Sequence, residues 1–332
     1  DDPEMSAQGI IDNKYDGVVL GRASLADPYY PRKVEMGCPE QIRPCIACNQ
    51  GCIGRTMTGG DASCAVNPRA GRELDFGIEK ALQRKKIVVV GGGLAGMEMA
   101  RTAKLRGHDV ELYEKSGVLG GNLVPGSKHE FKIDIARLNK WYELQLSDLG
   151  IPVYRNTPMD AKKVAATKAD VAVLAVGSVP VVPDLPGVDG PKVATSIEAL
   201  NGQKAIGDRV VVVGGGLVGC EMAYDYAKEG KKVTVVEALP AILASGEPTP
   251  IMNGMMIHDL LAEYGVEVIT SHKLASVSEQ GAVIAPTDGG DERTIEADTV
   301  VLAVGYRALP SMGRELIGEG MEIYEIGDGN RV

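Results

Sequence analysis

Residues Lys86-Lys-Ile-Val-Val-Val-Gly-Gly-Gly-Leu-Ala-Gly96 decide how the rest of the sequence is interpreted. A short run of β-branched residues breaks into glycines and continues as residues 97–105, which have the composition of a helix. Gly91, Gly93 and Gly96 fill a G-x-G-x-x-G pattern. The first glycine allows a tight turn, the second lets the backbone approach a bound group, and the third lets helix and strand pack closely. The stretch predicts a strand, a glycine turn and a helix.

An acidic residue follows this turn at an informative spacing. Residues 109–114 predict a second strand that ends in Glu114, which lies 23 residues after Gly91. A helix N-terminus favours phosphate charge, and a carboxylate at this distance along the chain suits a hydrogen bond to ribose hydroxyls. These features together predict a dinucleotide-binding site.

The whole unit occurs twice. Residues 209–219 repeat it 123 positions later, and Glu237 again lies 23 residues beyond the first glycine of the pattern. Between Val88 and Glu114, 14 of 27 positions are identical at that offset. A lone glycine pattern is weak, because glycine turns also join ordinary strands and helices. Strand, glycines, helix and acid in the same order twice favour two dinucleotide sites. The glycines of the second pattern are Gly214, Gly216 and Gly219.

Composition narrows the class of protein. The chain has 332 residues, of which 44% are hydrophobic and 24% charged, so it is globular and long enough for two or three domains. A net charge of -10 argues against nucleic acid and against an anionic membrane surface as partners. There is no signal-peptide pattern, which predicts a cytoplasmic protein. The chain lacks an initiator Met and ends abruptly at Val332, so we expect a fragment of a longer protein.

Four cysteines follow the spacing C-x2-C-x3-C-x11-C. Cys45, Cys48, Cys52 and Cys64 are separated by glycines and small residues. This spacing suits a 4Fe-4S cluster held by four thiolates. Zinc is the main chemical rival, although zinc sites usually pair two C-x2-4-C knuckles. Disulfides are the third interpretation, and they need an oxidising compartment of which the sequence gives no sign.

Other stretches predict the framework around these motifs. Residues 4–14 and 128–149 are expected to be helical, and Tyr15–Leu20 is expected to be a strand. The pair Gly21-Arg22 after that strand could bind a phosphate, although an arginine after a strand is more often a surface residue. Ala169–Gly177 predicts a buried parallel strand, and prolines between 180 and 191 predict a linker.

The second half closes on the same kind of strand. Residues 297–305 share seven of nine positions with 169–177. Residues 252–264 predict a helix, 266–269 a strand, and 281–286 with 293–295 a small hairpin. The chain then ends in a strand that reaches Gly327-Asp328.

These motifs together resemble the NADH:flavin oxidoreductase family, which includes 2,4-dienoyl-CoA reductase and 2-enoate reductase. The two dinucleotide units and the late Gly-Asp resemble the flavoprotein disulfide-reductase-like fold. Asp16–Arg22 resembles the last strand of the family's FMN-binding (β/α)8 barrel, and Cys64–Glu73 resembles the loop after its cluster. The resemblance covers essentially the whole chain.

The resemblance implies an α/β architecture with two nested Rossmann-like domains of three layers and parallel sheets. Before them it implies the last strand and flanks of a barrel and a Cys-rich iron-sulfur loop. The implied domains are a barrel remnant (1–40), a 4Fe-4S cluster loop (41–80), the first part of an FAD domain (81–205), an NADH domain (206–305) and a truncated return segment of the FAD domain (306–332).

The resemblance also assigns roles to residues. The FMN phosphate would be bound by Arg22, and the cluster by the four cysteines of the motif. The NADH residues would be Gly214, Gly216, Gly219, Glu237 and Gly305. The FAD residues would be Gly91, Gly93, Gly96, Glu114, Gly121, Gly177 and Asp328.

The implied activity is a short electron chain. NADH would reduce FAD, the cluster would pass single electrons to FMN, and FMN would reduce an activated C=C bond of a small-molecule substrate. Glu237 with no arginine after it predicts NADH over NADPH. The catalytic residues are expected in the missing barrel, and the sequence names neither the substrate nor the oligomeric state.

Three rival functions share some of these sequence features. An amine dehydrogenase of the trimethylamine dehydrogenase type would run towards oxidation, and the acidic second fingerprint favours an NADH user instead. A disulfide reductase needs a redox cysteine pair after the first glycine turn, and residues 97–130 contain no Cys. An electron-transfer subunit without its own substrate is the third possibility, which barrel strands upstream in the gene would disfavour.

Overall fold

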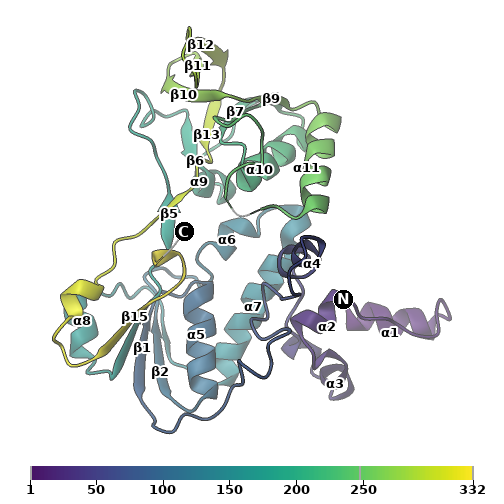
Figure 1. The fold of residues 1–332 in the computed structure, drawn as a ribbon, viewed down its shortest axis with the longest axis vertical. Coiled ribbons are helices and arrows are strands. Elements are labelled where there is room, and N and C mark those ends of the chain that lie inside the picture. Colours follow the sequence, from purple (N-terminus) through teal and green to yellow (C-terminus); the bar gives the residue numbers. More distant parts are fainter. Residues whose placement is uncertain (1, 247, 331–332) are drawn as a thin grey trace. The chain divides into compact units, whose positions relative to one another are not determined.

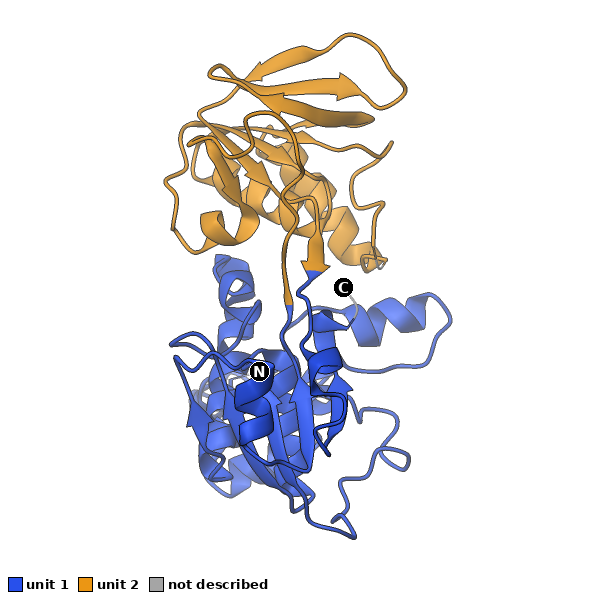
Figure 2. Ribbon diagram, turned by 90° about the vertical axis from the view of Figure 1, so that its left-hand side faces the viewer, with its two compact units in different colours: residues 1–177, 308–332 blue, residues 178–307 orange. Residues whose placement is uncertain are grey.

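The computed structural model describes residues 2–246 and 248–330. The chain divides into two compact units, coloured separately in Figure 2. Unit 1 comprises residues 1–177 and 308–332, and unit 2 comprises residues 178–307. The sequence predicted a boundary between residues 205 and 206. The structure places it between residues 177 and 178, because residues 178–205 belong to unit 2.

Unit 1 contains a five-stranded parallel sheet. Its order is β15-β4-β1-β2-β3, so the first strand of the unit lies in the middle. The bounds are β1 Lys86–Val90, β2 Asp109–Tyr113, β3 Val153–Tyr154, β4 Val171–Leu174 and β15 Glu322–Glu325. The last of these pairs with β4 although more than a hundred residues separate them in sequence.

Helices cover both faces of this sheet. On one face lie α5 (Leu94–Leu105) and α7 (Ile133–Asp148), next to β1 and β2 (Figure 1). Their buried side chains pack on alternate residues of β1 such as Val89. On the other face Val88 packs with residues of α8 (Ala161–Ala166) and η4 (Gly313–Leu316). Since both faces are covered, the central strands β1 and β4 are almost entirely apolar and buried, as is usual for central parallel strands.

Unit 2 repeats this arrangement. Its sheet has the order β6-β13-β7-β8-β9 and is parallel. The strands are β6 Val193–Thr195, β7 Arg209–Val213, β8 Lys232–Val236, β9 Glu267–Ile269 and β13 Thr299–Leu302. The helices are α9 Ser196–Leu200, α10 Leu217–Lys228 and α11 Ile251–Glu263. The predicted α/β class with two Rossmann-like units is therefore confirmed.

Shorter elements complete both units. Unit 2 carries an antiparallel sheet of β10 His272–Val277, β11 Gly281–Pro286 and β12 Arg293–Glu296, and β5 Ser178–Pro180 pairs with β14 Tyr306–Ala308. In unit 1 the N-terminal part holds α1 Pro3–Ile11, α2 Arg22–Ala26, α3 Tyr30–Glu35, η1 Pro39–Gln41, η2 Gln50–Gly54 and α4 Arg55–Met57. The remaining elements are α6 Leu123–Gly126, η3 Glu130–Lys132 and η5 Gly327–Gly329.

Some expected elements differ from the structure. Tyr15–Leu20, expected to be the last barrel strand, belongs to no sheet among the described residues, and Val19 is 96% exposed. A strand needs ladder partners for its backbone groups, and none of the described strands lies against this segment. The expected hairpin of residues 281–295 is a three-stranded sheet, because β10 also pairs with β11. The helix expected from residue 128 begins at Ile133.

Candidate dinucleotide and cysteine sites

The glycine turn of unit 1 is sterically specific. Gly91 follows β1 with a φ of +110°, and a Cβ there would lie 2.2 Å from the Ala175 carbonyl oxygen. A Cβ on Gly96 would lie 1.9 Å from the Gly91 carbonyl oxygen. Gly93 is the N-cap of α5 and has no side-chain cap. The turn therefore leaves the first N–H groups of α5 available for an anion such as a pyrophosphate.

Glu114 is fixed beside this turn. The residue is 8% exposed, and its two carboxylate oxygens accept hydrogen bonds from the backbone N–H groups of Gly92 (2.7 Å) and Ser116 (2.8 Å). Charge-assisted bonds to two backbone donors hold a carboxylate in one orientation. The sequence reasoning missed Gly92, whose N–H anchors the acid. The sequence feature that could have indicated this role is the position of Gly92 as the middle of three consecutive glycines.

The other residues predicted to bind FAD lie at the same edge of the sheet. A Cβ on Gly121 would be 3.1 Å from the Gly93 Cα, and Gly327 of η5 approaches Ala95 of α5. Gly329 approaches the backbone of Gly177. Asp328 lies between these two glycines in η5. The structure thus brings together all seven predicted residues around the start of α5, at the carboxyl end of β1, where open α/β sheets bind ligands.

Unit 2 has the same geometry. Gly214 has a φ of +109°, and a Cβ there would lie 2.4 Å from the Ala303 carbonyl oxygen. A Cβ on Gly219 would lie 2.0 Å from the Gly214 carbonyl oxygen, and Gly216 is the N-cap of α10. Gly305 lies just after β13, the strand next to β7. Its φ is +99°, and a Cβ there would have no atom within 4 Å.

Glu237 is held as Glu114 is. It is 8% exposed and accepts hydrogen bonds from the N–H groups of Gly215 (2.5 Å) and Leu239 (2.7 Å). No arginine lies in the turn that holds it, which continues as Ala238-Leu239. A carboxylate without a nearby cation suits ribose hydroxyls and repels a 2′-phosphate.

The four predicted cysteines line one cavity. Cys45, Cys48, Cys52 and Cys64 share it with apolar residues, Arg22 and Asn49, and no His, Asp or Glu is among its lining residues. Burial raises the pKa of the Cys45 and Cys48 thiols. Within the described residues, no group of three or more His, Cys, Asp or Glu side chains is placed to hold a metal ion. The donor set, four thiols and no carboxylate, fits an iron-sulfur cluster in its chemistry.

Arg22 and the remaining cysteines are also placed. Arg22 is the first residue of α2 and donates a hydrogen bond to the Asn49 side chain, which brings it to the cysteine cavity. Cys220 is fully buried in α10, and burial raises its pKa to about 12, so it packs as a small apolar residue. Cys38 lies outside the cavity lining.

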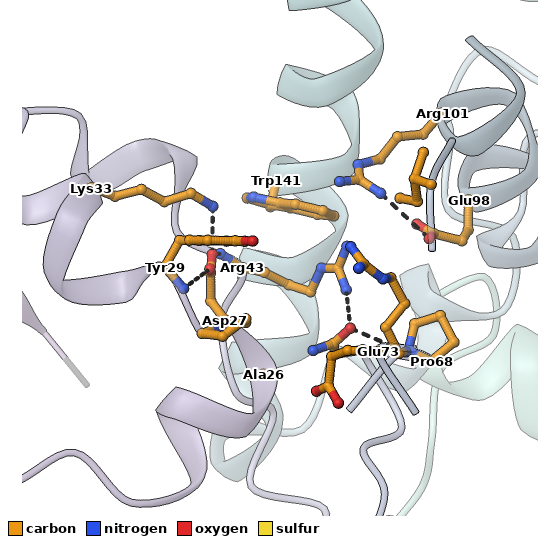
Figure 3. A pocket seen from close by; sticks show the side chains of 14 residues that line it. Ala26, Asp27, Tyr29, Lys33, Arg43, Pro68, Glu73, Glu98, Arg101 and Trp141 are labelled. Carbon is orange, nitrogen blue, oxygen red and sulfur yellow. Dashed lines mark hydrogen bonds and ion pairs between the residues drawn. The ribbon is translucent and has the colours of Figure 1, made fainter. Parts of the chain in front are cut away.

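Trp141 does more than the sequence suggested. We expected packing, and the structure places its indole between the guanidinium groups of Arg43 and Arg101, as Figure 3 shows. Arg43 immediately precedes the first cysteine turn and is 8% exposed. Sequence reasoning missed both arginines. A single buried arginine two residues before the first cysteine of the motif gives no periodic pattern in the sequence, and the residues that it contacts lie far away along the chain.

Comparisons with known proteins agree with this geometry. The family model described as pyridine nucleotide-disulphide oxidoreductase matches residues 85–320. A cinnamate reductase from Clostridium sporogenes is 40% identical over 332 residues, which are 100% of this chain and 49% of that protein. An NADH oxidase from Thermoanaerobacter brockii is 38% identical over 338 residues, which cover 100% of this chain and 51% of that protein.

A solved structure extends the match to three dimensions. The complex of 2-naphthoyl-CoA reductase with 2-naphthoyl-CoA superposes with a TM-score of 0.93 at 35% identity, and the match covers 100% of this chain and 50% of that one. The chain therefore spans about half the length of the relatives it matches. Among the described residues, none of the helices is both long and apolar enough to cross a bilayer.

The chain belongs to the pyridine nucleotide-disulphide oxidoreductase family. Within it, the match along the entire chain to a cinnamate reductase, an NADH oxidase and a 2-naphthoyl-CoA reductase agrees with the resemblance that the sequence predicted. The family name does not carry disulfide chemistry to this chain, because residues 97–130, where a redox cysteine pair would follow the first glycine turn, contain no cysteine.

Proposed function

We propose that this chain is the electron-input part of an NADH-dependent flavin oxidoreductase. In the intact enzyme, NADH would supply electrons that reach an FMN centre by way of FAD and a 4Fe-4S cluster, and an activated C=C bond would be reduced. The observation that carries the proposal is the pair of matched turns, each with a buried glutamate fixed by two backbone N–H groups. The matches to a cinnamate reductase and a 2-naphthoyl-CoA reductase support the class of reaction.

Unit 1 is proposed to hold FAD. The first N–H groups of α5 would bind the pyrophosphate, and the fixed Glu114 carboxylate would accept hydrogen bonds from the adenosine ribose. Gly121, Gly177 and Asp328 lie around the same helix start and would contact the remainder of the flavin nucleotide. These residues bind and orient, and the flavin itself supplies the ability to accept two electrons and release them singly.

Unit 2 is proposed to bind NADH by the same means. The start of α10 would take the pyrophosphate, and Glu237 would bind the adenosine ribose. Gly305 leaves open space beside this turn, where a side chain would otherwise stand. We propose a preference for NADH, because a 2′-phosphate would meet a buried carboxylate with no compensating arginine in its turn.

The four thiols that line one cavity are proposed to hold the 4Fe-4S cluster. Arg22, at the rim of the same cavity, is proposed to bind the FMN phosphate of the complete enzyme. We propose that the substrate and the catalytic acid lie in the part of the relatives that this chain does not cover, which is about half of their length.

The test is an anaerobic assay of the full-length gene product with NADH and an aryl enoate such as cinnamate, and separately with an aromatic acyl-CoA. We expect NADH oxidation that depends on the unsaturated acid or thioester, and the saturated product by mass spectrometry. Oxidation of NADH with no reduced organic product under strict anaerobiosis would overturn the proposed reaction, whereas substrate-dependent NADPH oxidation alone would overturn the cofactor assignment.

A further inference from the structure

Arg43 joins the two ends of the cysteine motif. It lies two residues before Cys45, and one of its terminal nitrogens donates hydrogen bonds to the Val66 carbonyl oxygen (2.9 Å) and the Asn67 side-chain oxygen (3.3 Å). Val66 lies two residues after Cys64. A single buried guanidinium thus connects the chain just before the first cysteine with the chain just after the last.

The backbone at Arg43 is held from the opposite side. Its N–H donates to a carboxylate oxygen of Asp27 at 2.8 Å, and Asp27 is 3% exposed and also accepts a bond from Lys33 at 2.5 Å. Asn67 is anchored separately, because its amide nitrogen donates to the Leu25 carbonyl oxygen at 2.8 Å. The arginine and its acceptors are therefore fixed before any group enters the cysteine cavity.

The Arg43 guanidinium also packs on the indole ring of Trp141. The centre of the Arg43 guanidinium lies 4.6 Å from the indole centroid, and that of Arg101 lies 5.1 Å from it (Figure 3). The indole N–H donates to the Gln41 carbonyl oxygen at 2.8 Å. Trp141 belongs to α7, which packs on α5, the helix that starts at the glycine turn. The cysteine loop is thereby attached to the helices of the same unit that carry the FAD turn.

We propose that Arg43, held by Val66, Asn67 and Trp141, is a clasp that preorganises Cys45 and Cys64 for the cluster and couples the cluster loop to α7. This inference rests on the proposed function, since it concerns the cluster that the four thiols would hold. Arg43 is a positioning residue. It acts through the backbone on either side of the motif, and its fixed positive charge favours the more negative, reduced state of the cluster.

The clasp can be tested by removing the guanidinium and its stacking partner separately. The variants are Arg43→Met, Arg43→Lys and Trp141→Leu, with Arg84→Met as the matched control, because Arg84 pairs with Asp109 at the exposed surface. After anaerobic reconstitution of the full-length protein, the release of iron to a ferrous chelator is timed and the cluster midpoint potential is measured.

We expect Arg43→Met to release iron about 10- to 100-fold faster than the parent, with a lower midpoint potential. Arg43→Lys keeps the charge and loses the planar fork, so it should restore the potential more fully than the iron retention. Trp141→Leu should act in the same direction and more weakly. Because the two residues act as a unit, the double variant should be no worse than Arg43→Met alone.

The apo-protein provides a readout that does not depend on iron. Trp141 is the only tryptophan among the 332 residues of this chain, so the difference in emission between the parent and Arg43→Met reports on the contact of its indole with the guanidinium. Arg43→Met should shift its emission and increase quenching by iodide, whereas Arg84→Met should leave both unchanged.

The outcomes separate this inference from the proposed function. A parent protein that takes up no iron overturns both. A parent that holds the cluster, with an Arg43→Met variant of unchanged iron release, potential and Trp141 fluorescence, overturns the clasp alone. A variant that loses its fold would show a collapsed thermal transition. Arg43→Lys and Trp141→Leu then decide the matter by iron release and midpoint potential, neither of which requires Trp141.

Discussion

Unit 1 and unit 2 share the glycine turn, the fixed glutamate and the order of four parallel strands, β4-β1-β2-β3 and β13-β7-β8-β9. The fifth strand differs, because β15 is the last strand of its sheet in sequence and β6 is the first of its own. In both units the loop that follows the glutamate is hydrogen-bonded to the middle glycine of the turn. The Gly120 N–H donates to the Gly92 carbonyl oxygen in unit 1, and the Leu243 N–H donates to the Gly215 carbonyl oxygen in unit 2, each at 2.8 Å. In unit 1, however, η5 also reaches the turn, where Gly327 approaches Ala95. The helices α5 and α7 additionally pack on the cysteine loop.

This difference suggests that the same glycine turn holds its dinucleotide for different lengths of time in the two units. A site surrounded by segments from several parts of the chain loses a bound cofactor slowly, because several contacts must open together. The turn in unit 2 is contacted by its own sheet and by the loop that follows Glu237, which suits a dinucleotide that enters and leaves at each turnover. We therefore expect unit 1 to retain FAD and unit 2 to exchange NADH.

The largest effect should come from a side chain on the first glycine of either turn. Gly91→Val meets the Ala175 carbonyl oxygen and a φ of +110°, so it carries about 1–3 kcal/mol of backbone strain and an additional clash. We expect purified Gly91→Val to contain no FAD, whereas Gly214→Val should keep FAD and fail to accept electrons from NADH. Flavin content and NADH bleaching measure this. Gly126→Ala, with open space around it, is the control, and equal flavin loss in both valine variants would refute the division of roles.

The next effect concerns the cysteine loop, which only unit 1 carries. Cys64→Ser should lose most of the visible cluster absorbance, because a hydroxyl is a poor ligand for iron compared with a thiolate. Cys38→Ser should retain it, since Cys38 lies outside the cavity. Iron and acid-labile sulfide assays on the two variants make the measurement. Full iron in Cys64→Ser would remove that residue from the ligand set.

A smaller effect separates the two fixed glutamates. Glu237→Ala removes a charged hydrogen-bond acceptor, so the ratio of kcat/KM for NADH to that for NADPH should fall by about 10- to 100-fold. Glu114→Ala should leave this ratio unchanged and weaken FAD retention. Steady-state kinetics with both coenzymes give the ratio. A parent enzyme that prefers NADPH, or an unshifted Glu237→Ala, would show that Glu237 does not read the ribose.

The smallest effect should be on the acid stability of unit 2, and it concerns an ion pair at the amino ends of β7 and β13. The Arg209 side chain and its backbone N–H hold the pKa of Asp298 down at about 2. Because the folded-state pKa lies below the ordinary pKa of an aspartate, the pair stabilises unit 2 fully above about pH 4. That stability is lost as the pH falls towards 2. Asp298→Asn should flatten the acid limb of thermal unfolding between pH 4 and pH 2, and an unchanged limb would contradict this assignment.

Much of this architecture follows from local sequence. The turns at Gly91 and Gly214, the helices after them and the acids Glu114 and Glu237 obey spacing rules that a short segment contains. Tyr15–Leu20 failed as a strand prediction because a strand exists only with partners, and its β-branched residues do not reveal whether partners are present. The segment 178–205 was assigned to the wrong unit because β6 joins its sheet only through pairing with β13.

The clasp could not be predicted for the same reason. Arg43 contacts residues 23, 24 and 98 positions away in the sequence, and neither its neighbours nor any periodicity mark it as buried. Trp141 is the only tryptophan in the sequence, but the sequence does not indicate which residues its indole contacts. Motifs whose function lies in backbone geometry are visible in sequence, whereas side-chain contacts across a fold require the structure.

The proposed FAD and cluster sites are tested most directly by an anaerobic visible spectrum of the purified protein before and after addition of NADH, with iron and flavin analysis of the same sample. We expect an equimolar amount of FAD and about four irons per chain, with the flavin bands bleached by NADH. Zinc in place of iron would contradict the cluster, and a protein reconstituted with FAD that binds none would contradict the role of unit 1.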